Sequence, residues 1–259
     1  VPVCQGWRTL VDAEGLAARV EGMKFMNRIQ RFVRSRAGIA IVVILLGCAI
    51  LLLALVSVRL VTGRGLGIST FVRSVPDLTQ AVLDSSQVAS SGQGEFTNII
   101  FLHHSTGHNL IEQGGVRERF TVAGYQFWDH GYNPTGLRNP AGEYTGYSYN
   151  IPNDNTDPDG LARIFAQRPN DLPVNALSGL LQHEVIAFKS CFPASQITSE
   201  EQLAQYKTWY LGMRDVMDRH PNKVFIVMSP PPLNPAATDA EAATRARAFA
   251  EWLQSDEYL

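Results

Sequence analysis

The strongest pattern in this chain is an uncharged, apolar run over residues 37–58. The run is long enough for one helix to cross the apolar core of a bilayer. Basic residues are dense before it and sparser after it, so the positive-inside rule places the N-terminus in the cytoplasm. We predict a single-pass signal anchor in the cytoplasmic membrane, with the C-terminal part of the chain extracytoplasmic. The basic residues are Lys24, Arg28, Arg31, Arg34 and Arg36 before the run, and Arg59, Arg64 and Arg73 after it.

Two other interpretations of this run stay open. A cleaved signal peptide would have a shorter apolar core and a cleavage site of small residues. The segment Leu45-Leu-Gly-Cys48 resembles a bacterial lipobox, in which Cys48 would be lipidated, although the apolar run continues beyond this cysteine. Met23 is followed by a basic segment and looks like a natural start. Residues 1–22 of the cytoplasmic leader 1–36 are therefore a candidate for an extension outside the native protein.

After the apolar run the pattern changes twice. Residues 59–95 are rich in Gly, Ser, Thr and Gln, and we predict a stalk or linker there. From residue 96 to 259, apolar runs alternate with helical patterns, which predicts an α/β domain with a parallel sheet and helices on both faces. The expected strands cover residues 98–102, 184–188 and 223–228, with a further short strand at 125–128. The expected helices cover residues 110–120, 158–167, 199–219 and 238–254.

Composition narrows the classes of function. The chain has 259 residues, a formal net charge of -2 and no basic stripe, so we expect no nucleic-acid partner. Its three cysteines, Cys4, Cys48 and Cys191, lie in three different regions, which excludes a disulfide framework within the domain. We expect Cys191 to be a buried small hydrophobe, with a reactive thiol as the alternative.

Two segments raise the question of a metal. The stretch Asn153-Asp-Asn-Thr-Asp-Pro-Asp-Gly160 resembles the first half of a calcium loop, but the twelfth position of that register is Ala166 instead of an acid. We expect a run of Asx turns that caps the helix at Pro158. A metal held by His103, His104 and His108 is a weaker alternative, because the histidines lack paired spacing. We predict no metal and no cofactor.

The candidate chemistry lies where the strand 98–102 breaks into a polar turn that carries three histidines and Ser105. Ligands of such sheets bind beyond the carboxyl ends of strands. A serine at a strand-to-helix turn is exposed, and the amides of the next turn point toward an oxyanion. We therefore predict Ser105 as a nucleophile, with oxyanion donors from the amides of Thr106, Gly107 and His108.

Serine needs a base to take its proton, and histidine is the usual base near neutral pH. If the strand continues through the turn, side-chain alternation places His103 on the face of Ser105 and His104 on the other face. His108, one helical turn on, could reach back. All three histidines are candidates for the base, and the alternative for each is a packing role.

Two further strand ends are expected beside this turn. Lys189 and Ser190 follow the strand 184–188, and Ser190 could donate to an oxyanion if the two strands are neighbours. The prolines at 230–232 hold a rigid loop after the strand 223–228. The alternative for both is a purely structural loop. We predict that residues 121–156 form a long structured insertion that shapes a substrate pocket.

The order of these parts resembles the SGNH (GDSL-like) hydrolases, which carry a serine after the first strand and polar turns after later strands. The motifs His103-His-Ser-Thr-Gly107 and Phe188-Lys-Ser-Cys-Phe-Pro193 resemble those of a bacterial, membrane-anchored SGNH-like subgroup. The resemblance covers residues 96–259. It implies a flavodoxin-like three-layer α/β/α domain, an ester substrate that is a small molecule or a carbohydrate, and Ser105 as the nucleophile.

The chain departs from that family at three places. The Gly-Asp-Ser-Leu block reads His-His-Ser-Thr here, and the Gly-x-Asn block reads Lys189-Ser190-Cys191, without the asparagine donor. Asn109 is a candidate replacement. The C-terminal Asp-x-x-His block does not appear before Leu259. We expect that the chain is truncated ahead of its base, that a local histidine serves instead, or that the domain is inactive.

Two functions follow from the sequence. The first is a membrane-anchored, extracytoplasmic serine esterase or acyltransferase. The alternative is an inactive SGNH-like envelope protein that binds glycans through the aromatic-rich segment 125–149.

Overall fold

The computed structural model describes residues 36–62, the single positions 72, 76, 79 and 83, and residues 95–259. The chain divides into two units, the first ending at Ser57, and we describe each by itself. The predicted leader 1–36 lies almost wholly outside the described residues, as does most of the predicted stalk.

Helix α2, Arg36–Thr62, contains the whole apolar run. Many of its large apolar side chains are exposed, among them Val43, Leu46 and Leu53. Among the described residues, no helix is both long enough and apolar enough to cross a bilayer. The transmembrane anchor stays a prediction.

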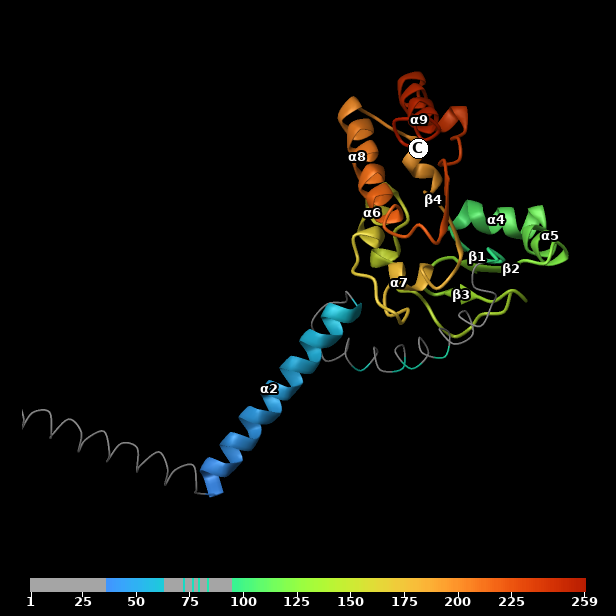
Figure 1. The fold of residues 1–259 in the computed structure, drawn as a ribbon. Helices are drawn as coiled ribbons and strands as arrows, with labels where there is room; N and C mark the ends of the chain where they lie inside the picture. The colour runs from blue at the N-terminus through green and yellow to red at the C-terminus, as the bar shows by residue number, and fades with distance from the viewer. Residues whose placement is uncertain (1–35, 63–71, 73–75, 77–78, 80–82, 84–94) are drawn as a thin grey trace, which may run out of the picture. The chain divides into compact units, whose positions relative to one another are not determined.

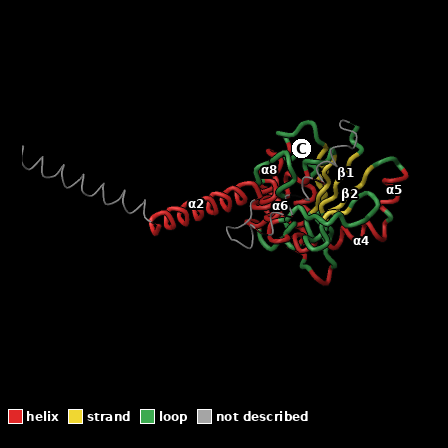
Figure 2. Tube along the Cα trace, turned by 90° about the horizontal axis from the view of Figure 1, so that it is seen from below, coloured by secondary structure: helices red, strands yellow, loops and turns green. Residues whose placement is uncertain are grey.

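The domain is built on a five-stranded sheet that confirms the α/β prediction (Figures 1 and 2). The strand order is β3-β2-β1-β4-β5, and only β3 runs antiparallel to its neighbour. The parallel order β2-β1-β4-β5 is consistent with a flavodoxin-like fold and makes β1 the central strand. The strands are β1 Asn98–Leu102, β2 Gln126–His130, β3 Leu137–Arg138, β4 Val185–Lys189 and β5 Val224–Met228.

Helices cover both faces of the sheet, with α4 and α5 on one side and α6 and α8 on the other (Figure 1). All residues of β1 and β4 are buried for this reason. The helices of the domain are α4 Ser105–Gly114, α5 Val116–Val122, α6 Pro158–Phe165, α7 Ala176–Leu180, α8 Glu200–Met217 and α9 Ala240–Trp252. Three short 3-10 helices are η1 Pro152–Asp154, η2 Phe192–Ser195 and η3 Pro235–Ala237.

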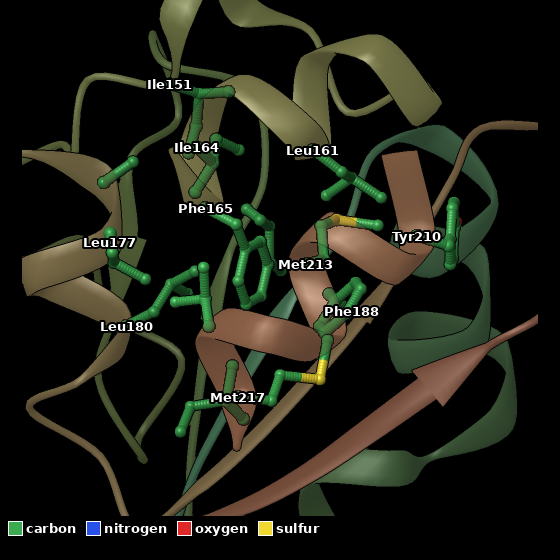
Figure 3. Packing of buried hydrophobic residues seen from close by; sticks show 14 of the residues in the cluster. Ile151, Leu161, Ile164, Phe165, Leu177, Leu180, Phe188, Tyr210, Met213 and Met217 are labelled. Atoms are coloured by element: carbon green, nitrogen blue, oxygen red, sulfur yellow. The ribbon is translucent and has the colours of Figure 1, made fainter. Parts of the chain in front are cut away.

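The larger hydrophobic cluster lies on the α6 and α8 side (Figure 3). Phe165 of α6 and Phe188 of β4 pack with ring centroids 5.1 Å apart, and Met213 of α8 lies beside them. The smaller cluster joins Ile99 and Phe101 of β1 to the α4 side. Alternate residues of one strand therefore hold two layers of helices in place.

The predicted helix over residues 110–120 is wrong at both ends. The helix begins five residues earlier, at Ser105, and ends where Gly115 adopts the left-handed conformation with φ 59°. A separate helix, α5, then continues to Val122. A glycine costs little at such a position, because it has no Cβ to clash with the following carbonyl.

Candidate functional site

Ser105 is the first residue of α4, three residues after β1 ends at Leu102. Its side chain is exposed, while His104 before it is buried and has extended backbone angles. The amides of Gly107 and His108 donate to His104 O at 2.9 and 3.0 Å. Within the described part of the chain, the amides of Ser105 and Thr106 donate to no group. The amides free to hold an oxyanion therefore come from Ser105 and Thr106. Thr106 was predicted as a donor, whereas the predicted donors Gly107 and His108 are bonded to His104 O.

The hydroxyl of Ser105 has a thiol as its neighbour. Ser105 Oγ lies 3.8 Å from Cys191 Sγ, and either atom can be the donor. Cys191 follows β4, which pairs directly with β1, so the two turns meet at the same edge of the sheet. Its side chain is partly exposed, which differs from the buried thiol that we expected. No histidine ring bonds to Ser105 Oγ among the described residues.

His103 belongs to a buried ion cluster with Asp129 and Arg117, and neither of its ring nitrogens bonds to Ser105. His103 Nε2 lies 3.0 Å from Asp129 Oδ2, and His103 Nδ1 lies 3.0 Å from His104 O. Both partners are acceptors, so the arrangement is satisfied in full when both ring nitrogens carry a proton. The sequence argument required the strand to continue through His103 and Ser105. The strand ends at Leu102, so side-chain alternation does not place His103 on the face of Ser105.

The ion cluster ties three elements together. Arg117 of α5 forms an ion pair with Asp129 of β2 and donates to Phe127 O and Asn139 O, both at 2.8 Å. Burial alone would raise the pKa of Asp129. The hydrogen bond from His103 and the charges of His103 and Arg117 outweigh burial and lower it. Asp129 is therefore a carboxylate whose charge the fold compensates on both sides.

Gly107 has no side chain, and this lets α4 pack closely against His103 of the cluster. A Cβ at Gly107 would overlap the His103 side chain, whereas a Cβ at Gly212 of α8 would meet nothing within 4 Å. We expect Gly107→Ala to lower the free energy of unfolding by about 1–3 kcal/mol through overpacking. Gly212→Ala should raise it by up to about 1 kcal/mol, because alanine favours a helix. Urea unfolding of both variants measures the two changes in the free energy of unfolding. Equal changes would contradict the close contact between Gly107 and the His103 side chain.

His104 connects the nucleophile turn to the insertion. Its ring stacks on Tyr132 with centroids 4.0 Å apart, and its Nδ1 lies 3.2 Å from Thr156 Oγ1. Its Nε2 lies 3.6 Å from Asp154 Oδ1, which is too long for a hydrogen bond. Burial lowers the pKa of His104, although the charge of Asp154 opposes the shift. The insertion thus reaches the site, and Tyr132 keeps 42% of its surface exposed.

His108 and Asn109 are both exposed on α4. His108 stands three residues after Ser105, so the two side chains lie on the same side of the helix. Helical side chains lean toward the N-terminus, which directs His108 toward Ser105. The rings of His103 and His104 both form hydrogen bonds, whereas the ring of His108 forms none with the described residues.

Lys189 and Ser190 lie next to the site but differ in what they offer. Lys189 is buried and its Nζ donates to Ser190 O at 3.1 Å. Burial lowers its pKa, while Cys191 and Asp157 act in the opposite direction. Ser190 is fully buried, and its Oγ bonds to Tyr210 OH at 3.0 Å. The Ser190 hydroxyl is therefore committed to the core and not to an oxyanion beside Ser105.

The acidic stretch before α6 forms the Asx turns that we expected. Asp157 N donates to Asn155 Oδ1 at 2.7 Å, and Asn155 Nδ2 donates to Asp159 Oδ1 at 3.1 Å. Asp157 precedes Pro158 at the start of the helix, although its side chain makes no capping bond. In residues 36–62 and 95–259, no group of three His, Cys, Asp or Glu side chains is placed to hold a metal ion.

Two buried histidines that the sequence did not single out are kept neutral mainly by their burial. His130 Nδ1 lies 2.8 Å from Gly131 O, and its Nε2 accepts from the amide of Tyr149 at 3.0 Å. His183 lies 2.8 Å from both Tyr149 OH and Asn98 Oδ1. Burial lowers the pKa of His130 to about 4 and that of His183 to about 3. A proton on His130 Nε2 would point at an N–H, which adds to the cost of charging it.

Acid should therefore weaken the fold below about pH 6.5. The unfolded chain binds protons at the ordinary histidine pKa, whereas the folded chain resists them until the lowered pKa is reached, so stability falls as pH falls. We expect each of the two histidines to contribute a loss of about 2 kcal/mol between about pH 7.5 and about pH 5.

Urea unfolding across that range measures this loss. The variant His108→Gln, at an exposed position, should leave the slope unchanged, whereas His130→Gln should reduce it. A flat profile in the unchanged protein would show that the two rings titrate normally.

The candidate site thus brings together Ser105, Cys191 and two free amides, with the exposed His108 one turn along α4. Such an arrangement suits attack on a carbonyl and stabilisation of the oxyanion that forms. Comparison with family models, with curated proteins and with solved structures finds no match to this chain.

Proposed function

We propose that this protein is a membrane-anchored, extracytoplasmic SGNH-like serine hydrolase that acts on ester bonds. One observation carries the proposal: Ser105 is an exposed serine at the start of α4, beyond the central parallel strand, beside two unpaired amides. Helix N-termini favour negative charge, so an oxyanion formed at this place would be stabilised.

In the proposed reaction Ser105 Oγ attacks the carbonyl carbon of the ester, and a base takes the hydroxyl proton. The oxyanion accepts hydrogen bonds from the amides of Ser105 and Thr106 as the carbonyl bond opens. The alcohol leaves with the proton, and an acyl ester remains on Ser105. Water then cleaves that ester and releases the acid, whereas a second alcohol in place of water would make the protein an acyltransferase.

His108 is the local histidine best placed to serve as the base. His103 has both ring nitrogens engaged, and His104 is buried with Nδ1 on Thr156. His108 is exposed and stands one turn from Ser105. A histidine on the surface of α4 can turn toward Ser105 Oγ without leaving another buried group unpaired.

Aromatic side chains favour a carbohydrate as the alcohol part of the ester. Tyr132 stacks on His104, next to Ser105, and remains 42% exposed. Tyr144 of the same insertion is 50% exposed. Exposed tyrosines offer both an apolar face and a polar tip to a ligand.

The anchor is the second part of the proposal, and residues 37–58 would cross the bilayer within α2. Protease added outside sealed, right-side-out vesicles should then release the domain. A domain that is protected until the vesicles are broken would contradict the proposed orientation.

A fluorophosphonate probe tests the nucleophile directly, because an activated serine displaces fluoride from phosphorus and an inert serine does not. We expect labelling of the full chain to map to Ser105 by peptide mass spectrometry. His108→Gln should slow the labelling at least tenfold if this histidine is the base. Absence of label at Ser105 under conditions that label a known serine hydrolase would contradict the proposal.

The second candidate is an inactive SGNH-like envelope protein that binds glycans. The observation that favours it is that Ser105 Oγ contacts a thiol instead of a histidine ring. In that case the probe would leave Ser105 unlabelled, while soluble oligosaccharides would bind to the full chain. Tyr132→Ala should then weaken glycan binding, whereas Ser105→Ala should not.

A further inference from the structure

A pocket of about 430 Å³ lies between η2, the proline-rich loop 229–235 and α9. Its walls are mostly apolar, and the polar groups on them include Ser229 and Arg247. A pocket of this size is typical of small-molecule sites. The apolar walls come from Ala194, Pro230, Leu233, Ala246 and Phe249.

The pocket is lined by residues that follow β4 and β5, at the same end of the sheet as Ser105. Cys191, which lies 3.8 Å from Ser105, is followed directly by η2, and Ala194 of η2 lines the pocket. Ser229 follows β5, which is two strands away from β1, and adjacent strands lie about 4.8 Å apart. The pocket therefore begins about 10 Å from the nucleophile, estimated from that strand spacing.

Arg247 is the charged group of the pocket. Within the described part of the chain, its guanidinium forms no ion pair and no hydrogen bond. Arg245, two residues earlier on α9, donates to Ile197 O and Thr198 O and lies near two glutamates. The guanidinium of Arg247 thus remains available, beside an apolar wall, for an anionic group that the protein does not supply.

We propose that this pocket binds a medium-chain carboxylate, with the chain between the proline-rich loop and α9 and the carboxylate at Arg247. Apolar walls favour an alkyl chain, and a carboxylate matches the planar fork of a guanidinium. A carboxylate of this kind is also what ester hydrolysis at Ser105 would release. Binding itself does not depend on that reaction, so the site is proposed independently of the proposed function.

Isothermal titration of the full chain in lipid nanodiscs with octanoate tests the proposal, with empty nanodiscs as the blank. We expect saturable binding that tightens about fourfold for each methylene from butanoate to octanoate. Arg247→Gln should weaken octanoate about three- to fivefold, which is typical of an exposed charge pair, and leave neutral octanol unchanged. Arg119→Gln, at an exposed arginine of α5, is the matched control and should change neither ligand.

Blocking the pocket gives a second measure. Ala246→Trp should remove the binding of both ligands. If that variant does not fold, Leu233→Glu in the surface loop is the substitute, and it should weaken the binding of octanoate more than that of octanol. Octanoate that does not bind, or that binds equally well to all these variants, would overturn the proposal. Ser105→Ala should still bind octanoate. A loss of the proposed hydrolase activity and a loss of the pocket are therefore separate results.

Discussion

Ser105→Ala should lower the rate of p-nitrophenyl acetate hydrolysis by the full chain at least about 10³-fold, to the level of the uncatalysed reaction. The reason is that the proposed reaction passes through an acyl ester on Ser105 Oγ, and alanine has no atom that can form it. Acetate is the suitable first acyl group, because it needs no acyl pocket. Release of p-nitrophenol, followed by absorbance, measures the rate.

The matched control is Thr208→Ala, which also removes one hydroxyl. Thr208 is exposed on α8 and donates only to Ala204 O at 2.9 Å. Its loss should leave the rate unchanged. Equal rates in Ser105→Ala and the unchanged protein would mean that surface lysines or histidines hydrolyse the ester, and the serine mechanism would be rejected.

Asp129→Asn should lower the free energy of unfolding by about 3–5 kcal/mol, the largest stability effect that we expect from a single substitution. Asp129 is the acidic member of the buried ion cluster, and its side chain is 5% exposed. The amide that replaces it carries no charge, so Arg117 and His103 would remain buried with less compensation. The remaining bonds of Arg117 to two backbone carbonyls limit the loss but do not neutralise its charge.

Urea unfolding at neutral pH measures this effect, and Asp159→Asn is its control. Asp159 pairs with Arg163 one turn along α6, where the arginine side chain is 54% exposed. Exposed pairs of this type contribute about 0.3–0.5 kcal/mol. If both variants lost the same small amount, the buried cluster would not be a stabilising unit of the fold.

The local part of the site was predictable from sequence. The strand 98–102 was predicted at its observed bounds, because a short, unbroken apolar run before a polar turn is typical of a buried strand. The Asx turns before Pro158 were predictable for the same reason, since their hydrogen bonds join residues that are neighbours in sequence. The same holds for the start of α8, where the amide of Gln202 donates to Ser199 Oγ at 3.2 Å and Ser199 caps the helix.

The partners within the site were not predictable. The sequence argument placed His103 beside Ser105, but Asp129, which lies 26 residues away, holds the His103 ring in the buried cluster. The start of α4 was also missed, because Ser-Thr-Gly-His is a weak helix former and the packing of Gly107 on His103 sets the helix there. Cys191 meets Ser105 only because β4 pairs with β1.

Sequence alone determined the α/β class, the apolar run at 37–58 and the position of Ser105 at a strand end, since each depends on the order of apolar and polar residues along a short stretch. Tertiary structure alone decided the order of the strands, the hydrogen-bond partner of each polar side chain in the site and whether that side chain is buried. The runs that form β4 and β5 are both apolar, yet β4 is buried while β5, at the edge of the sheet, exposes Val224 and Ile226. The physical reason is that burial and pairing are set by neighbours far away in the sequence, and no short stretch of residues contains them.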